Sequence, residues 1–422
     1  MKISKAGAWC ASLMCGLASV CATADDGGLT LADAINNALT RNPELRASAF
    51  RISRAQAELE EARLRPAPEL ALELENFAGS GDLHGTEALE STLSFTRVLE
   101  LGGKRSARVE AAELAGDLAA LDQRARELDI LAEVTRRFLA AAAAAEQLSL
   151  AKETEHLAQE TLHAIARRVA AARSPLADES RARIAATRAN LDVEQATSTS
   201  RTRRYALAAS WGETEPQFGA LRADLFSFES DPGFAALMKR MERNPAFLRF
   251  AGEIRFRDAQ LRLAQAQNRP DLALTLGLRQ LQEGGDTALV AGVSMPLNLP
   301  KRNETTLRRA RVDLAQAQAE QDAAAVLART TLFGLYEEMS RSRRRAEALR
   351  ADALPLARTA LEQTQAGYDR GRFAFSELAA ARQELLALQS AAIESAATYH
   401  ELRTEIQRLT GEPLNSIEAT QP

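Results

Sequence analysis

Two histidines and a glutamate on one predicted helix face have the spacing of metal ligands. His156, Glu160 and His163 fall at i, i+4 and i+7, so a helix presents all three on the same side. Imidazole and carboxylate groups in such an arrangement can bind Zn²⁺. The chain contains only four histidines, and its sequence suggests no further ligand elsewhere. We therefore interpret the triplet as a solvated helix face, and predict no metal site and no bound cofactor.

Sequence motifs for enzymatic chemistry are missing as well. The stretch AGSGD (78–82) lacks the spacing and the strand–helix context of a phosphate-binding loop. The stretch SPLAD (174–178) is not a nucleophile elbow. The sequence thus predicts that the protein is not an enzyme, and a periplasmic hydrolase is a disfavoured alternative.

The first 24 residues have the pattern of an export signal. Lys2 and Lys5 precede a short apolar run, and Ala22-Thr23-Ala24 forms an A-x-A cleavage site, so we predict a signal peptide over 1–24. An alternative makes Cys21 a lipidated cysteine, but the residue before it is the branched Val20 rather than a small one. Either reading exports the protein.

The composition of the mature chain narrows its class. All three cysteines (10, 15 and 21) lie in the leader, so the mature chain has no disulfide and no thiolate ligand. Without Lys2 and Lys5 its formal charge is −6, from 51 basic and 57 acidic residues. An acidic chain does not favour a nucleic-acid partner.

Short stretches recur at a nearly constant distance of about 200 residues. PELALEL (68–74) matches PDLALTL (270–276), and Asn42-Pro43 matches Asn244-Pro245, both at an offset of 202. LGGKR, which ends at 105, matches NLPKR, which ends at 302, and RRVAAARSPLADESRAR (167–183) matches AGYDRGRFAFSELAAAR (366–382). This order predicts a duplicated unit. We place the first repeat at 25–212, a linker at 213–232, the second repeat at 233–412 and a tail at 413–422.

Each repeat contains two segments in which apolar and polar residues alternate, a pattern typical of half-buried strands. We expect the fourth strand to include Leu289, Ala291, Val293, Met295 and Leu297, and the second to include Leu89. The predicted apolar face carries these residues: Leu70, Leu72, Leu74, Leu93, Phe95, Leu272, Leu274, Leu276, Leu289 and Val293.

Two structures fit these strands. One is an amphipathic sheet that lies on the helices of a soluble protein. The other is part of an outer-membrane barrel, with leucines toward lipid and carboxylates toward water. Four strands cannot close a barrel, and open edges are not tolerated in lipid, so the second structure requires several chains to pool their strands.

The remaining sequence predicts two very long helices. From 104 to 172 no proline occurs, and a seam of apolar and small residues steps by four and three, as in a coiled coil. A helix of this length extends about 100 Å. The second copy, 302–370, has the same span, and Pro355 should kink it. Such helices must pack lengthwise with each other and with neighbouring chains.

In combination, these features resemble the TolC-like outer membrane factor family. The resemblance rests on the exported leader, the duplication and the motifs ALTRNPELRAS, SFTRVLELGGKR, VSMPLNLPKRNETTLRRARVDLAQAQAE and YDRGRFAFSELAAARQELL. It covers nearly all of residues 29–412. The LELGGKR form is most similar to the cobalt–zinc–cadmium (CzcC-like) branch.

The resemblance implies a mainly α fold with a small β part. Such chains form homotrimers, in which each gives four strands to a 12-stranded transmembrane β-barrel and long helical hairpins to a periplasmic α-barrel. It implies a passive exit duct of a tripartite efflux pump in the outer membrane, with heavy-metal cations as the expected substrates. The implied partners are outer-membrane lipid, a periplasmic adaptor (membrane fusion protein) and an inner-membrane RND-type transporter.

By the same resemblance, the turns at the ends of the helical hairpins contact the adaptor. The residues in question are Ala172 and Arg173 in the first turn, and Arg370, Gly371 and Arg372 in the second. Ala172 stands where the family has glycine, and Pro175 follows it. Without the resemblance, these arginines would be ordinary solvated charges.

The resemblance also implies a gate beside these turns. Glu377 matches an acidic position that narrows the pore, and a ring of three such carboxylates would attract cations. Asp178 and Tyr368 match positions that tie neighbouring hairpins together, so we expect a hydrogen bond between them. The alternative for each residue is a surface side chain at a helix end. For the whole protein, the alternative is a periplasmic coiled-coil scaffold without channel activity.

Overall fold

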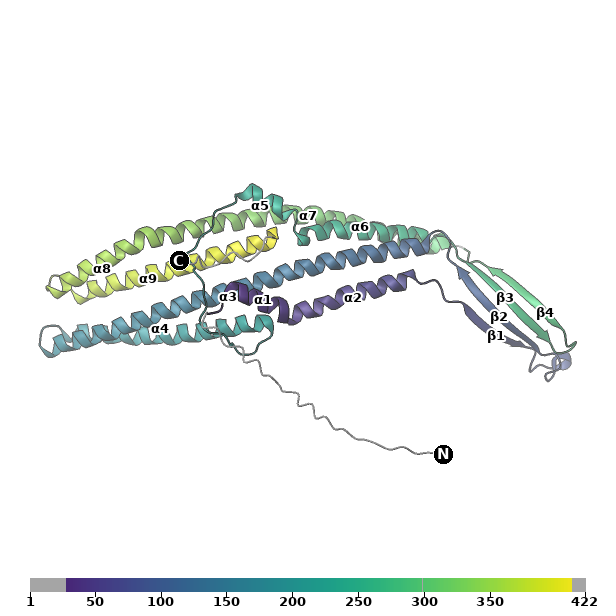
Figure 1. Cartoon of the computed structure of the whole chain (residues 1–422), viewed down its shortest axis with the longest axis horizontal. Helices are drawn as coiled ribbons and strands as arrows, with labels where there is room; N and C mark the ends of the chain where they lie inside the picture. Colours follow the sequence, from purple (N-terminus) through teal and green to yellow (C-terminus); the bar gives the residue numbers. More distant parts are fainter. Residues whose placement is uncertain (1–27, 298, 412–422) are drawn as a thin grey trace, which may run out of the picture.

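The computed structural model describes residues 28–297 and 299–411. The predicted signal peptide 1–24, with Cys21, and the predicted tail 413–422 lie outside these residues. The described part of the chain is elongated, with a β-sheet at one end and helical turns at the other (Figure 1).

The first half of the chain runs through a helix pair, two strands and a helical hairpin. Its elements are α1 (Leu31–Arg41), α2 (Pro43–Arg63), β1 (Glu69–Glu75), the short 3₁₀ helix η1 (Gly81–Leu83), β2 (Glu90–Leu99), α3 (Lys104–Ala170), α4 (Leu176–Ala208) and the 3₁₀ helix η2 (Ala209–Trp211).

The second half repeats this order. Its elements are α5 (Phe234–Met241), α6 (Pro245–Ala266), β3 (Leu272–Leu281), β4 (Thr287–Ser294), α7 (Leu299–Ala348), the π-helical turn η3 (Leu349–Ala353), α8 (Leu354–Asp369) and α9 (Phe375–Thr410).

Pro355 interrupts the second long helix, as predicted. It is the second residue of α8 and follows the π-helical turn η3. A proline inside a helix lacks the N–H for the i−4 hydrogen bond and its ring clashes with that carbonyl, and the wider turn accommodates both effects. The first long helix, α3, has no proline and runs without interruption for 67 residues.

The repeated Asn-Pro pairs perform the same task in both halves. Asn42 and Asn244 precede α2 and α6, and their side-chain oxygens accept backbone N–H groups of the first helical turn at 2.7–3.0 Å. Their side-chain nitrogens donate, at 2.7 Å, to the backbone carbonyls of Ser210 and Arg408. Each asparagine therefore caps one helix and ties it to the end of another.

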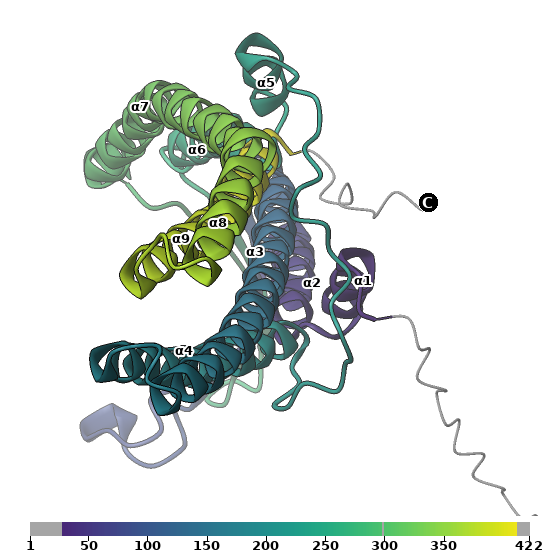
Figure 2. The same ribbon diagram turned by 90° about the vertical axis from the view of Figure 1, so that its left-hand side faces the viewer.

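The long helices lie side by side in two sets. Nearer the sheet the order is α2–α3–α6–α7, and nearer the tips it is α4–α3–α9–α8. Seen from the tip end, they form an arc (Figure 2). Residues of the predicted α3 seam face this packing. Ala132, Thr135 and Leu139 are buried, and Leu118 and Leu121 fill the space that a side chain at Gly252 of α6 would occupy. Within the described ranges, no helix is both long enough and apolar enough to cross a membrane.

The four strands form one antiparallel sheet in the order β1-β2-β3-β4. Two of its ends differ from the sequence prediction. Leu89 lies outside β2, where its N–H bonds to the Thr86 carbonyl in a turn. Met295 and Leu297 lie beyond β4, which ends at Ser294 because the next residue but one, Pro296, has no N–H for the ladder.

Residues 212–233 connect the two halves and cross the helices as an extended segment, called the strap below. Leu29 pairs with this strap, donating to the Ala220 carbonyl at 2.8 Å. Leu225 is buried against α3 and α9, and its carbonyl lies 3.0 Å from Nε2 of His400 on α9. Farther along, Asp231 accepts a 2.8 Å hydrogen bond from the Tyr336 hydroxyl on α7. These contacts fix the two halves to each other at mid-length.

Candidate functional site: the helical tips and the sheet

The two tip turns have the same backbone conformation. Ala172 and Gly371 both take a left-handed conformation, with φ of 53° and 74°. In each turn the following residue, Arg173 or Arg372, donates its N–H at 2.8 Å to a carbonyl five residues earlier. This is the Schellman closure of a helix. The predicted tip residues Ala172, Arg173, Arg370, Gly371 and Arg372 are all exposed.

The shared conformation leads to opposite expectations for the two turns. A residue with a Cβ costs about 1–2 kcal/mol in the left-handed region. Gly371→Ala should therefore lower the free energy of unfolding of the second hairpin by about 1 kcal/mol, and Ala172→Gly should not lower that of the first. Hydrogen exchange at the tip amides measures both. Equal protection changes in the two variants would contradict the shared geometry.

Asp178 and Glu377 occupy equivalent places, as the third residues of α4 and α9. Oε2 of Glu377 accepts the N–H of Ala374 at 2.8 Å, so this exposed carboxylate caps the start of its helix. Asp178 is largely covered and lies 3.5 Å from Arg181. The capping bond uses one carboxylate oxygen of Glu377, and the predicted acidic ring stays a prediction.

Tyr368 lies between the two hairpins, but its hydroxyl does not make the predicted contact. The side chain is 8% exposed and packs with Ile165, Ala182, Phe375 and Leu378. The hydroxyl oxygen is buried and has no hydrogen-bond partner among the described residues. The expected Asp178–Tyr368 hydrogen bond is thus not formed in this structure. Packing of the ring into the apolar cluster sets the position of the hydroxyl.

Two arginines that the sequence did not single out lie at the junction of the hairpins. The Arg168 guanidinium carbon is 4.6 Å from the centroid of the Tyr368 ring. Arg382 donates to Gln365 at 2.8 Å and also to the Thr161 hydroxyl. Burial lowers the pKa of Arg382 from its ordinary value. In the sequence, the only signal for Arg382 was a charged residue within the alanine- and leucine-rich first part of α9.

The predicted apolar residues of the strands share one face of the sheet. The register aligns Leu72, Leu93, Leu278 and Leu289 in one row across the four strands. The next row consists of Leu70, Phe95, Leu276 and Ala291. Leu74, Leu272, Leu274 and Val293 flank these rows on the same face. Most of these side chains are exposed in the single chain.

One charged residue interrupts this face. Arg97 pairs with Leu274, one row nearer the helices than Leu276. Long basic side chains near the end of an apolar band can reach a polar boundary. Arg97 was missed because its neighbours in the sequence follow the alternation, and only the Leu99–Leu272 pair lies nearer the helices on the same face of β2 and β3.

The opposite face of the sheet is polar. The hydroxyls of Thr96 and Thr275 lie 2.9 Å apart. Arg279 on β3 bonds to Glu90 at 2.8 Å and to Thr92 at 3.0 Å on β2, and lies 3.2 Å from Glu75 on β1. This face therefore suits contact with water.

The histidine–glutamate triplet of α3 stays on a solvated surface. Nε2 of His156 lies 3.4 Å from Oε1 of Glu160, and both side chains are mostly exposed, as is His163. Among residues 28–297 and 299–411, no group of three or more histidine, cysteine or acidic side chains is arranged to hold a metal ion.

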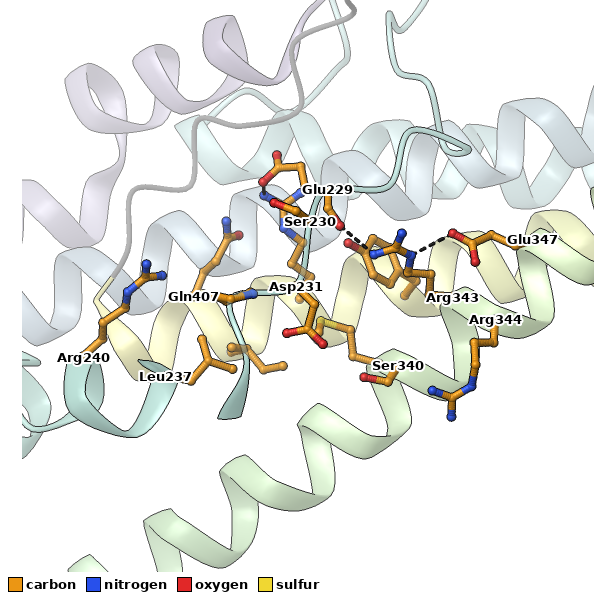
Figure 3. A pocket seen from close by; sticks show the side chains of 15 residues that line it. Glu229, Ser230, Asp231, Leu237, Arg240, Ser340, Arg343, Arg344, Glu347 and Gln407 are labelled. Carbon is orange, nitrogen blue, oxygen red and sulfur yellow. Dashed lines mark hydrogen bonds and ion pairs between the residues drawn. The ribbon is translucent and has the colours of Figure 1, made fainter. Parts of the chain in front are cut away.

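A cavity of about 500 Å³ lies at the strap rather than at the tips. It is bounded by strap residues 229–232, α5, α7 and α9 (Figure 3). Arg343 crosses it, donating to the Glu229 carbonyl at 2.9 Å and to Glu347 at 2.7 Å. The first of these bonds joins the strap to α7, so the polar lining holds the strap against the second half.

The sequence and the fold both match known proteins. The family model for "Outer membrane efflux protein" matches residues 34–213 and 237–412. The chain is 30% identical over 385 residues to the cobalt-zinc-cadmium resistance protein CzcC of Cupriavidus metallidurans, covering 91% of this chain and 90% of the relative. It is 27% identical to the nickel-cobalt-cadmium resistance protein NccC of Alcaligenes xylosoxydans, covering 68% and 65%.

The fold is similar to that of the outer membrane protein VceC of Vibrio cholerae, with a TM-score of 0.75 and 19% identity, covering 91% of this chain and 97% of that one. That likeness supports the mainly helical fold with its small sheet. Together with the family match, it leads to one conclusion: the chain belongs to the outer membrane efflux protein family, the TolC-like outer membrane factors.

Proposed function

We propose that three copies of this chain form the outer-membrane exit duct of a tripartite efflux pump, and that the duct passively conducts heavy-metal cations. The observation that carries the proposal is a sheet with one exposed leucine face, joined directly to long helices, of which α3 alone extends about 100 Å. The leucine face suits lipid and the helices suit a tunnel beneath it. A signal peptide over 1–24 and a duplication, with repeats 25–212 and 233–412, belong to the same proposal.

Assembly into a ring follows from the edges of the sheet. Strands β1 and β4 are its outer strands, and each has one side that no described strand of the chain pairs. Unpaired backbone N–H and C=O groups in lipid cost several kcal/mol each, so the edges must be paired by other copies. A head-to-tail ring of chains pairs β4 of one copy with β1 of the next.

The edges of the helical layer carry exposed apolar residues as well. On α7, Val312, Val326 and Phe333 recur at multiples of seven residues, and Val326 is 70% exposed. On the other edge, α2 presents Phe50, which is 74% exposed. Exposed apolar residues with this spacing are typical of a helix surface that packs against another helix in a coiled coil. We infer that α7 of one copy packs on α2 of the next.

Metal cations are the favoured cargo because of the named relatives and the acidic gate position. The relatives are resistance proteins for cobalt, zinc, cadmium and nickel. In this chain Glu377 supplies one carboxylate per copy beside the tip. We further propose that the exposed tip turns bind a periplasmic adaptor, and that an RND-type transporter in the inner membrane supplies the driving force. A duct of this kind is not an enzyme and needs no cofactor.

Deletion of the gene that encodes this chain tests the proposed function. A deletion strain should tolerate less cobalt, zinc or cadmium and should accumulate more of the affected metal than its parent. Returning the gene on a plasmid should restore both. Unchanged tolerance and unchanged accumulation for these metals and for nickel would rule out the proposed cargo.

The acidic ring has a separate electrical test. Glu377→Gln removes one charge per copy but keeps an oxygen that can accept the Ala374 N–H, so the helix cap survives. In planar bilayers we expect this variant to show weaker cation preference and weaker block by multivalent cations from the periplasmic side. Glu58→Gln removes the same charge on α2, away from the tips, and should leave both unchanged. If the two variants behave alike, Glu377 acts only as a helix cap.

A further inference from the structure

Besides their apolar packing, the two hairpins of one chain are joined by arginine side chains at two places near the tips. The first hairpin is α3–α4 and the second is α8–α9, and α3 packs directly on α9. Near the tips, the side-chain hydrogen bond and the cation–π contact that cross between them start from Thr161 and Arg168 on α3, beside the apolar packing of Ile165 on Tyr368. Thr161 and Arg168 are seven positions apart, so they lie on the same helix face about 10 Å apart along the axis.

Arg168 forms the contact nearer the tip. Its guanidinium carbon lies 4.6 Å from the centroid of the Tyr368 ring, and Nη1 is 4.0 Å from the Asp369 carboxylate. A cation over an aromatic face is attracted by the ring quadrupole, more strongly as water is excluded. The Tyr368 ring is buried, so this contact is partly shielded from water.

Arg382 forms the contact farther from the tip, and it joins three helices. From α9 it donates one hydrogen bond to the Thr161 hydroxyl on α3 and another, at 2.8 Å, to the side-chain carbonyl of Gln365 on α8. A guanidinium that is partly buried needs such hydrogen bonds to offset its lost hydration. Moving the hairpins apart would break the bond to Thr161 while the bond to Gln365, within the second hairpin, could remain.

We propose that Arg168 and Arg382 are the residues that hold the two hairpins together beside the gate, and that Tyr368 contributes its ring face rather than its hydroxyl. The buried hydroxyl has no hydrogen-bond partner among the described residues, whereas the ring contacts Arg168. Two attachments about 10 Å apart along α3 resist both separation and rotation of the hairpins. This assignment rests on the proposed function, with the added premise that the duct opens when the hairpins move apart.

Four variants distinguish the contribution of the Tyr368 ring from that of its hydroxyl. Arg168→Gln and Arg382→Gln each remove one attachment, and Tyr368→Leu removes the ring. Each should raise the mean conductance of the trimer in planar bilayers about 3- to 10-fold, the shift that a contact of this strength can supply. Tyr368→Phe removes only the hydroxyl and should match the wild type. In the double variant Arg168→Gln, Tyr368→Leu, the effect should be smaller than the sum of the two single effects, because both changes remove the same contact.

A distance measurement on the same variants does not depend on conduction. The only cysteines of the sequence are at 10, 15 and 21, so Arg173→Cys and Arg372→Cys place spin labels on the two exposed tips. Electron–electron resonance should report a longer and broader intrachain distance in Arg168→Gln, Arg382→Gln and Tyr368→Leu, and the wild-type distance in Tyr368→Phe.

The outcomes distinguish this inference from the proposed function. If the tip distances widen as expected but no variant conducts ions, Arg168 and Arg382 do hold the hairpins together and the proposed duct function is wrong. If Tyr368→Phe opens the tips as far as Tyr368→Leu does, the hydroxyl is the tether and the inference is overturned. Unchanged tip distances in both Arg168→Gln and Arg382→Gln would overturn it as well.

Discussion

Leu276→Arg is expected to reduce the yield of outer-membrane trimer sharply. Leu276 is 66% exposed in the single chain and lies in the row with Leu70, Phe95 and Ala291, which contains no polar side chain. An arginine on the lipid face near mid-bilayer costs about 2–4 kcal/mol. Three copies carry the substitution, so the cost is incurred three times in one barrel. The yield is measured as heat-modifiable trimer in washed outer membranes.

Neighbouring positions on β3 provide matched controls. Thr275→Arg puts the same charge on the polar face, where it loses the bond to Thr96 but stays in contact with water, so trimer should still form. Leu274→Arg lies beside Arg97, nearer the end of the apolar band, and should cost less than Leu276→Arg. Equal trimer yields for Leu276→Arg and Thr275→Arg would mean that the two faces are assigned the wrong way round.

The stability of the helical region is expected to fall as pH decreases from about 6.5 to about 4, because of His400. This side chain is 1% exposed, and burial, as the largest cause, lowers its pKa to about 4. Nε2 lies 3.0 Å from the Leu225 carbonyl, and Nδ1 has no partner among the described residues. Protonation would therefore place a charged ring among Tyr399, Phe228 and the strap.

Acid destabilises the folded chain because the pKa of His400 is lower in the folded state than in the unfolded state. The unfolded chain binds a proton on this histidine near pH 6.5 and the folded chain only near pH 4, so acid favours unfolding. Three charged residues lie near His400. Arg403 opposes its protonation, and Asp224 and Glu229 favour it, but burial is the larger effect and keeps the pKa low. A shift of this size corresponds to about 3 kcal/mol across the window.

Thermal unfolding followed by circular dichroism between pH 7 and pH 4 measures the effect. The control is His400→Gln, which keeps a polar side chain that can bond the Leu225 carbonyl but does not titrate. Its unfolding temperature should depend less on pH than that of the wild type, even if it is lower at every pH. Parallel pH profiles for the two proteins would exclude His400 as the source.

The sheet and its faces could be predicted from the sequence because the information is local. Period-two alternation assigns each side chain of a strand to one face, and the register of β1 to β4 preserves that assignment. The ends of β2 and β4 differ from the prediction. Leu297 continues the alternation, but Pro296 cannot donate to a ladder, and the chain leaves the sheet before it reaches either residue.

The contacts at the tips could not be predicted in the same way. Which helix faces meet depends on the rotation of α3 against α9, and the sequence period does not fix it to one residue. Arg168 and Arg382 were therefore not singled out, and Tyr368 was assigned to a hydrogen bond that the structure does not contain. His400 was missed for a related reason, because it is buried only when the strap lies across α9.

Cell fractionation tests the central claim, that the chain is an outer-membrane duct, most directly. Envelopes should be washed with urea, separated on a sucrose gradient and run on gels without heating. The proposed duct should remain with the outer membrane as a urea-resistant trimer. Release of the chain with the periplasmic contents would contradict it, and would favour the coiled-coil scaffold instead.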